Sequence, residues 1–293
     1  MPPYNNIHRQ QLFHWIGSHI DAKLKLGRSR LTDDLRGEYV ECLRGALKNG
    51  LWVKTPRDPD FLGNGDLIKV TRPITCFTEW TLGQSLPHTS RYGRLGLGFP
   101  KRFVLSRGGQ PLIYVRDSAK NDPYTMALKA IAKLFKGNDL KGKISPSKLK
   151  TLRQHFDYLT HFNKRIKHAP IPRPVTKILK PAYIPVTISK ISKSIVPPDP
   201  FIRLFGPTLH YLEEREWRIV YDKILEVFFT TGPGSPGPEY FLPVKPGREL
   251  FTVVLPDNNT VNKALNDSFI RKKLYPADAP HVTVLSLQDI GTF

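Results

Sequence analysis

Proline is concentrated in one segment of the chain, His168 to Pro200, which contains eight prolines with Ile and Val between them. Proline has no backbone N–H and a fixed φ, so this density excludes a helix or a central β-strand. We expect an extended segment that crosses between two parts of the structure. The hydrophobic core must therefore be built from the sequence on either side of it.

A strongly basic stretch overlaps this segment. Residues 120–193 contain seventeen Lys or Arg and three acidic residues, a net charge of +14 in a chain whose total is +20 over 293 residues. No Glu occurs between Glu79 and Glu213, so the carboxylates that pair with cations on an ordinary surface are scarce. One-signed charge over this length favours a polyanionic partner, and we predict a nucleic-acid-binding surface; the alternative is a solvated, lysine-rich face.

The cations that we expect to contact nucleic acid lie on two predicted helices and just beyond them. They are Lys133, Lys136, Lys141, Lys143, Lys148, Lys150, Arg153, Lys164, Arg165 and Lys167. Aromatic residues such as Phe135 and Phe156 are interleaved with these cations, and their spacing assigns most of them to the core.

Hydrophobic periodicity predicts helices at both ends of the core. Apolar residues recur at steps of four within residues 6–26, and residues 33–48 form a helix with Thr32 as N-cap and Gly50 as its stop. Helices are also expected over 125–135, after Ser145-Pro146, and over 261–274. Strands are predicted over 67–71, 74–78, 95–99, 103–106, 112–115, 217–221, 225–230, 250–255 and 282–285.

This pattern predicts one α+β domain whose core is formed by residues 1–118 and 201–293. Residues 119–200 would be a basic helical and proline-rich insertion. The alternative is two domains divided near residue 120, which would leave each half with a small sheet.

Several classes of protein are excluded or disfavoured. No apolar run is long enough for a membrane helix, residues 1–9 lack the apolar stretch of a secretory signal, and Cys42 and Cys76 form no disulfide framework. We therefore expect a cytoplasmic protein with no membrane partner. The nine His are scattered without a metal-ligand spacing, and no phosphate-binding loop or serine nucleophile motif occurs, so we expect no metal.

An acidic cluster opens a predicted strand at Glu213–Arg218. A period of two puts Glu214, Glu216 and Arg218 on one face, and Trp217 on the other. Two carboxylates in this arrangement suit chemistry at a sugar, where one binds a hydroxyl group and the other stabilises a cationic ribose. The alternative is an edge strand whose charges face water.

Two further groups of residues are candidates for a site. The strand ending in Thr78-Glu79 is followed by Tyr92, which could stack on a planar ring, and by three glycines, Gly93, Gly96 and Gly98, which permit close backbone approach. Arg30 could bind a diphosphate beside the N-terminus of the helix that Thr32 caps.

Several of these segments together resemble the abortive phage infection AbiGi family. The resemblance rests on Arg30-x-Thr32, Leu47-Lys-Asn-Gly50, Ile74-Thr-Cys-Phe-Thr-Glu79, His88-x-x-x-Tyr92-Gly93, Gly96-Leu-Gly98-Phe99-Pro-Lys101, Gln110-Pro-Leu-Ile-Tyr114 and Glu214-Arg-Glu-Trp-Arg218. It covers roughly residues 30–115 and 210–220. The first motif of the family reads His-Phe-Thr, where this chain has Arg30-Leu31-Thr32.

The layout also resembles the ADP-ribosyltransferase superfamily. That resemblance implies a split, mixed β-sheet core with N-terminal helices, here carrying a basic helical insertion, and NAD as a substrate. Arg30, with Thr32, would hold the NAD phosphates or ribose, although Arg28 or Arg36 could take the place of Arg30. Thr78 would support that residue, Tyr92 would pack on nicotinamide, Glu216 would be the catalytic carboxylate and Glu214 would orient the acceptor.

The function expected from these features is transfer of ADP-ribose from NAD to a nucleic acid, RNA or DNA, by a phage-defence or toxin protein. The alternative is a non-enzymatic protein that binds nucleic acid or a partner, such as an antitoxin; a toxin would in turn have a neutralising antitoxin as partner. A third hypothesis is a HEPN-type ribonuclease, because Arg9-x-x-x-x-His14 matches its Arg-x4-His spacing. Such domains are all-helical, which disagrees with the many strands predicted here.

Overall fold

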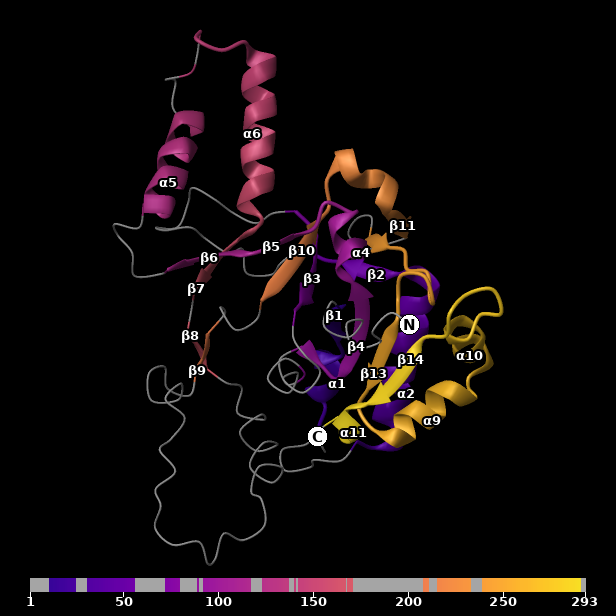
Figure 1. Ribbon diagram of the computed structural model, residues 1–293. Helices are drawn as coiled ribbons and strands as arrows, with labels where there is room; N and C mark the ends of the chain where they lie inside the picture. The colour runs from indigo at the N-terminus through magenta and orange to yellow at the C-terminus, as the bar shows by residue number, and fades with distance from the viewer. Residues whose placement is uncertain are drawn as a thin grey trace, which may run out of the picture.

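Antiparallel pairing of segments far apart in the sequence builds the centre of this α+β protein, a seven-stranded mixed sheet (Figure 1). A computed structural model describes residues 11–24, 31–55, 72–79, 89, 92–116, 123–136, 140, 142–166, 168–170, 208–210, 215–232 and 239–290. The order of the strands is β14-β13-β4-β1-β3-β10-β5. Their bounds are β1 (Gln11–Ile16), β3 (Ile74–Thr78), β4 (Leu95–Pro100), β5 (Gln110–Pro111), β10 (Glu216–Val220), β13 (Thr252–Leu255) and β14 (Thr283–Ser286).

All neighbours in this sheet are antiparallel except β13 and β14, which are parallel. Parallel strands need a crossover connection, and helices α9 (Asn258–Asn266) and α10 (Ser268–Leu274) supply it. The single helix expected over 261–274 is therefore two helices. Asp267 divides them, because it ends α9 and its side chain caps α10.

The predicted helix over residues 6–26 is wrong where the structure describes it. Residues 11–16 form β1, and only the short helix α1 (Ser18–Asp21) follows. The strand is central and buried on both faces, so its apolar residues do not alternate with polar ones. The resulting apolar pattern resembles the period of a helix. His14 thus lies in a strand, which removes the helical context that a HEPN-type ribonuclease requires.

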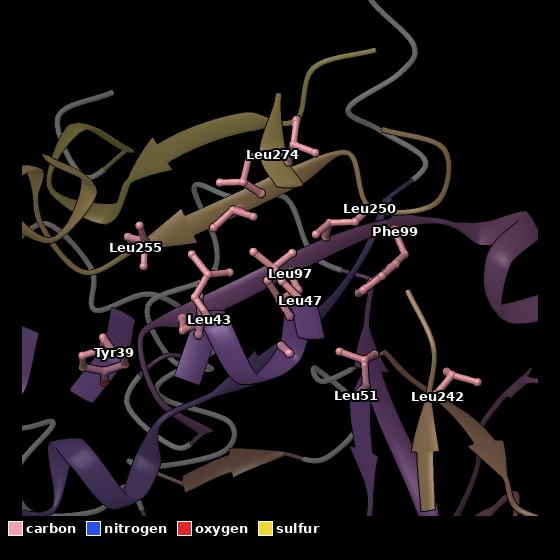
Figure 2. Packing of buried hydrophobic residues seen from close by; sticks show 14 of the residues in the cluster. Tyr39, Leu43, Leu47, Leu51, Leu97, Phe99, Leu242, Leu250, Leu255 and Leu274 are labelled. Carbon is pink, nitrogen blue, oxygen red and sulfur yellow. The ribbon is translucent and has the colours of Figure 1, made fainter. Parts of the chain in front are cut away.

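One face of the sheet carries the main hydrophobic core and is covered by helices. Leu12, Phe77, Leu97 and Phe99 from this face pack with α2 (Asp33–Asn49), which contributes Leu43 and other buried residues. Figure 2 shows Leu43 and Leu47 of α2 below Leu97, with Leu250 and Leu274 above it and Leu255 to the left. Burying one such side chain stabilises a fold by about 1.5–3 kcal/mol. We call this the helical face.

The opposite face has a different composition. Paired residues across the strands place Thr252, Gly98, Phe13, Thr78 and Glu216 in one row, on five successive strands. Side chains that are paired in this way share a face of the sheet. We call this the polar face, because its buried side chains include Gln11, Thr78, Glu216, Arg218 and Thr252.

Smaller sheets and helices complete the described structure. The smaller sheets comprise β11 (Thr230–Gly232), β12 (Glu239–Leu242) and β2 (Leu51–Val53); β6 (Ile113–Arg116) and β7 (Asn163–Ile166); and β8 (His168–Pro170) and β9 (Thr208–His210). The remaining helices are α4 (Lys101–Leu105), α5 (Pro123–Lys136), α6 (Pro146–Thr160), α11 (Leu287–Ile290) and the 3₁₀ helix η5 (Lys223–Phe228). Helices α5 and α6 extend away from the central sheet, at the upper left of Figure 1.

Two predicted strands are helical in the structure. Residues 101–105 form α4 directly after Pro100, whose fixed φ suits the position before a helix, and residues 223–228 form η5. The expected strand over 67–71 and most of the proline-rich segment, 171–200, lie outside the described residues. Among the described residues, no helix has the length and apolar content needed to cross a membrane.

Candidate functional site

Two of the predicted site residues are direct neighbours on the polar face. Glu216 on β10 pairs with Thr78 on β3, and Thr78 pairs with Phe13 on β1. The Thr78 hydroxyl donates a hydrogen bond to the carbonyl oxygen of Phe13 at 3.3 Å. The period of two expected for this strand is confirmed, since Glu216 and Arg218 lie on the polar face and Trp217 and Ile219 on the helical face.

Glu216 forms a buried ion pair with Arg218, two residues along the same strand. The Arg218 Nε donates to Glu216 Oε1 at 2.8 Å, and each side chain is 4% exposed. The alternative interpretation, an edge strand whose charges face water, is therefore wrong for Glu216 and Arg218. Burying two ionised groups costs free energy unless they are paired and hydrogen-bonded, so this ion pair fixes the positions of both side chains.

The ion pair is connected to the C-terminal end of α6. Arg218 Nη1 donates to the carbonyl oxygen of His161, the residue that ends α6, at 3.0 Å. His161 Nε2 accepts from the backbone N–H of Arg72 at 3.1 Å, so the ring hydrogen is on Nδ1, which donates to the carbonyl oxygen of Asp157 at 2.6 Å. Arg72 also forms ion pairs with Asp157 and Asp222. We call these groups the anchor network.

Tyr92 also lies on the polar face, but on the side of β1 and β13 and away from Glu216 on β10. Its ring packs against a small cluster formed by Phe13, Trp15, Val254 and Leu287. Gly93, the next residue, has a φ of +105°, and a Cβ there would lie 2.3 Å from the carbonyl carbon of Gly17. Gly93 is therefore required by a close approach of two backbones, which explains the Tyr-Gly pair without a ligand.

Three segments that carry the family resemblance meet at the ends of β3 and β10. Trp217 Nε1 donates to Glu79 Oε2 at 3.0 Å, and the Glu79 N–H donates to the carbonyl oxygen of Arg215 at 3.1 Å. Lys101 forms an ion pair with Glu79 and lies 5.6 Å from the centre of the Trp217 ring. Arg215 has a φ of +39°, the one positive value at a non-glycine residue in the described part of the chain. Strained backbone of this kind is found where the surrounding structure imposes it, including functional sites.

The first-motif residues are not brought to the polar face where they can be located. Thr32 caps α2 by accepting from the Leu35 N–H, and α2 covers the helical face. Arg36 pairs with Asp257 at 3.0 Å and so joins α2 to the start of α9, which rules it out as a substitute for Arg30 on the polar face. Arg28, Arg30, His88 and Glu214 lie outside the described residues.

The expected nucleic-acid contacts are placed mainly on α5 and α6. Lys133, Lys143, Lys148, Lys150 and Arg153 are all exposed. The side chains of Lys136, Lys164 and Arg165 are not described, and Lys141 and Lys167 lie outside the described residues. The only acidic residue within α6 is Asp157, whose carboxylate is paired with Arg72. Asp157 is four residues from Arg153 but is paired with Arg72, and no other acidic residue of α6 lies beside its exposed cations.

Sequence reasoning missed a set of buried polar groups. Among the described residues, six buried side-chain polar atoms have no hydrogen-bond partner, and three belong to the polar face: Gln11 Oε1, Trp15 Nε1 and Thr252 Oγ1. Unsatisfied buried groups are rare in native proteins and need an explanation. No sequence signal could have found them, because residues 11–16 were expected to be a helix and because only strand pairing places Thr252 of β13 beside Gly98 of β4.

The described residues contain no group of three or more His, Cys, Asp or Glu side chains placed to hold a metal ion. Cys42 and Cys76 are free thiols. A comparison with protein-family models finds no match, and comparisons with curated proteins and with solved structures find no significant match.

Proposed function

We propose that this protein transfers ADP-ribose from NAD to a nucleic acid, with Glu216 as the catalytic carboxylate. The observation that carries the proposal is the pairing of Thr78 with Glu216 on a buried sheet face that also holds the Tyr92 cluster. These three residues come from distant parts of the chain: the pairing of β3 and β10 brings Thr78 beside Glu216, and Tyr92 packs on the same face against the cluster that contains Phe13.

The chemistry requires few groups beyond this arrangement. The glycosidic bond between nicotinamide and ribose breaks, and nicotinamide leaves with the bonding electron pair. A carboxylate stabilises the cationic ribose that develops, and an acceptor atom of the nucleic acid then bonds to the ribose C1′ and loses its proton. Arg218 keeps the Glu216 side chain in a fixed position through their ion pair.

In this proposal the basic helices hold the nucleic acid that contains the acceptor atom. Helix α6 presents Lys148, Lys150 and Arg153 to solvent, and its C-terminal end meets the sheet at the anchor network. A nucleic acid bound along α6 would therefore lead toward the edge strands of the sheet that carries Glu216. Phosphate contacts position a nucleic acid without reading its sequence, so this surface favours no particular base.

The test is incorporation of label from NAD into mixed RNA or DNA by the purified full chain. We expect transfer by the parent protein and none by Glu216→Gln. That variant removes the carboxylate with which Arg218 forms its buried ion pair, and breaking such a pair is expected to cost roughly 3–5 kcal/mol of stability. Loss of activity alone would therefore not separate chemistry from folding.

A double variant, Glu216→Gln with Arg218→Met, removes this ambiguity. It takes away both buried charges and should recover most of the thermal stability, as replacement of a buried pair by apolar groups commonly does. We expect it to fold and still transfer nothing, while the exposed Glu226→Gln serves as the matched control and keeps full activity. Transfer by the double variant, or no NAD consumption by the parent, contradicts the proposal.

A second candidate function is non-enzymatic binding of nucleic acid. The contact that favours it is the link from Glu216 through Arg218 to the carbonyl oxygen of His161, because this gives the carboxylate a structural role in joining the sheet to α6. In that case the parent should bind nucleic acid without consuming NAD, and the double variant should bind more weakly because the link from the sheet to α6 is lost.

A further inference from the structure

The small sheet β11-β12-β2 has one face turned away from the main hydrophobic core. Successive side chains of a strand point to opposite faces. In β12, Leu242 is fully buried in the main core and Tyr240 packs against it. Glu239 and Phe241, which alternate with them, therefore share the opposite face, and both are half-buried. We call this the outer face of the small sheet.

The carboxylate and the aromatic ring on the outer face lie close together. A Cβ on Gly232 of β11 would be 2.8 Å from Cε2 of the Phe241 ring, so the ring extends over this glycine. Gly232 is paired with Glu239 across the two strands. Glu239 and Phe241 are also two residues apart on one strand, which separates their Cα atoms by roughly 7 Å. A planar group stacked on the ring can therefore reach the carboxylate.

An open cavity of about 600 Å³ adjoins these two side chains. Its lining includes Lys48 and Asn49 at the C-terminal end of α2, Thr230 of β11, and Glu239 and Phe241 of β12. Sites for small organic ligands have volumes of this order. The cavity combines an aromatic side chain with polar groups, which is the composition of a site that orients a planar polar ligand.

Two charged side chains at the cavity form no ion pair with another residue of the described part of the chain. They are the Glu239 carboxylate and the Lys48 ammonium group. An ionised carboxylate accepts hydrogen bonds and donates none, whereas an ammonium group only donates. The cavity therefore offers an acceptor for N–H groups of a ligand and a cation for an anionic group.

Among the common bases, guanine is the one whose Watson–Crick edge presents two adjacent donors, N1–H and the N2 amine. These match the two oxygens of a carboxylate. Unpaired bases are recognised on this edge and stacked on aromatic side chains. We propose that the outer face of the small sheet binds guanine, with Phe241 stacked on the base, Glu239 accepting from N1 and N2, and Lys48 contacting a phosphate.

The outer face continues onto β2. Trp52 is paired with Phe241 across β2 and β12 and is 45% exposed. Lys54 Nζ lies 3.5 Å from the centre of the Trp52 ring, which places a second cation on this face. Strands β2 and β11 lie to the right of the central sheet in Figure 1, away from α5 and α6. The guanine site is thus separate from the cations of α6, whose phosphate contacts read no sequence.

The base preference is tested by calorimetric titration of the full chain with GMP, inosine monophosphate and AMP. Inosine keeps N1–H and lacks the N2 amine, and adenine has an acceptor at N1. We expect GMP to bind at least about tenfold more tightly than AMP, with inosine monophosphate between them, because a bidentate contact to a base discriminates by this order. The same order should appear for the strands UUGUU, UUIUU and UUAUU in fluorescence anisotropy.

Two variants assign the roles of the side chains. Glu239→Gln should abolish the preference for guanine, because the amide presents only one acceptor oxygen. Phe241→Leu should weaken all three ligands alike, by about fivefold or more, because stacking does not distinguish the bases. Both variants should melt close to the parent, since both side chains point away from the main core. Glu226→Gln removes the same charge from the exposed surface of η5 and should keep the parent preference.

Equal binding of guanine and adenine ligands by the parent, or a guanine preference that persists in Glu239→Gln, would overturn the inference. Duplex UUGUU should lose its advantage over duplex UUAUU, because the guanine edge is then paired. A preference among the single strands without measurable binding of GMP assigns the site to a nucleic acid. Binding of GMP that none of the strands displaces assigns it to a free nucleotide.

The inference rests on the proposed function only in naming a nucleic acid as one source of the guanine. If Glu239→Gln abolishes the guanine preference but NAD is never consumed, the guanine site stands and the transferase fails. If the parent transfers ADP-ribose but binds guanine and adenine ligands equally, the transferase stands and the guanine site fails.

Discussion

Two histidines show how single residues of this fold depend on burial. Burial lowers the pKa of His14, although a hydrogen bond with the carbonyl oxygen of Cys76 acts in the opposite direction. Burial also lowers the pKa of His161, where the charges of Arg72 and Arg218 add to the effect and contacts with Asp157 oppose it. Both rings are therefore held neutral in the folded protein at a pH where an unfolded chain begins to protonate them.

This difference predicts that stability falls as the pH is lowered below about 6.5, the ordinary value for histidine. In that range the unfolded chain binds protons that the folded chain does not, so the free energy of unfolding drops by up to about 1.4 kcal/mol per pH unit for each ring. Chemical denaturation between pH 7.5 and 5.5 measures it. His161→Asn should be less stable at pH 7.5 but should show a shallower dependence on pH.

The exposed His155→Asn is the control for this measurement, and it should change stability little at any pH. A parent protein whose stability is flat or rises over this range would contradict the burial of both rings.

At the scale of elements, capping side chains decide where the helices begin. Thr32, Ser145, Asp257 and Asp267 each accept a hydrogen bond from a backbone N–H in the first turn of α2, α6, α9 and α10. Asp257 has a second function, because its carboxylate pairs with Arg36 of α2. Burial works against the charge, but hydrogen bonds from Thr260 and Arg36 hold the pKa of Asp257 below its ordinary value.

Asp257→Ala should therefore destabilise the protein by about 1–2 kcal/mol at pH 7, because the cap and the link between α9 and α2 are both lost. Asp257→Asn keeps a capping side chain and should cost less. The advantage of the parent over Asp257→Asn should shrink as the pH falls below about 4, since a lowered pKa stabilises only above that range. Thermal unfolding of the three proteins checks this, and equal losses for Ala and Asn would contradict a capping role.

At the scale of the whole molecule, the basic helices α5 and α6 are separated from the main core. The main hydrophobic core lies between the central sheet and α2, α9 and α10, whereas the exposed cations of the insertion lie on helices that extend from the opposite end (Figure 1). The anchor network, together with packing of Leu112, Phe162 and Val220, joins the two parts. If the partner is a polyanion, as proposed, its attraction to the exposed cations of α5 and α6 would bring it to these helices.

Reversal of three charges on α6, Lys148→Glu, Lys150→Glu and Arg153→Glu, should weaken nucleic-acid binding strongly. If each cation contacts a phosphate, the slope of log affinity against log salt concentration should fall by about 2–3. The matched control reverses Arg271, Lys272 and Lys273, which are equally exposed on α10. It changes the net charge identically, so an equal loss of binding there would show that total charge, and not α6, determines affinity.

The sequence by itself determined the elements whose signals are local. Thr32, the acids after it and Gly50 define α2 to within a residue, and the β-branched and aromatic run Ile74–Thr78 defines β3 as observed. The period of two assigned Glu216 and Trp217 to opposite faces. These features follow from backbone sterics, capping and side-chain alternation, which act between residues close together in the chain.

Only the tertiary structure decided which elements meet. It made residues 11–16 a strand, because insertion between β3 and β4 buries both of its faces and supplies the hydrogen bonds that a helix would otherwise provide. It also paired Glu216 with Thr78, joined Arg218 to the end of α6 by a hydrogen bond and placed the side chains of Gln11 and Thr252 against Gly98. Such contacts depend on strand order and register, which are set by burial across the whole sheet and carry no signature within any one segment.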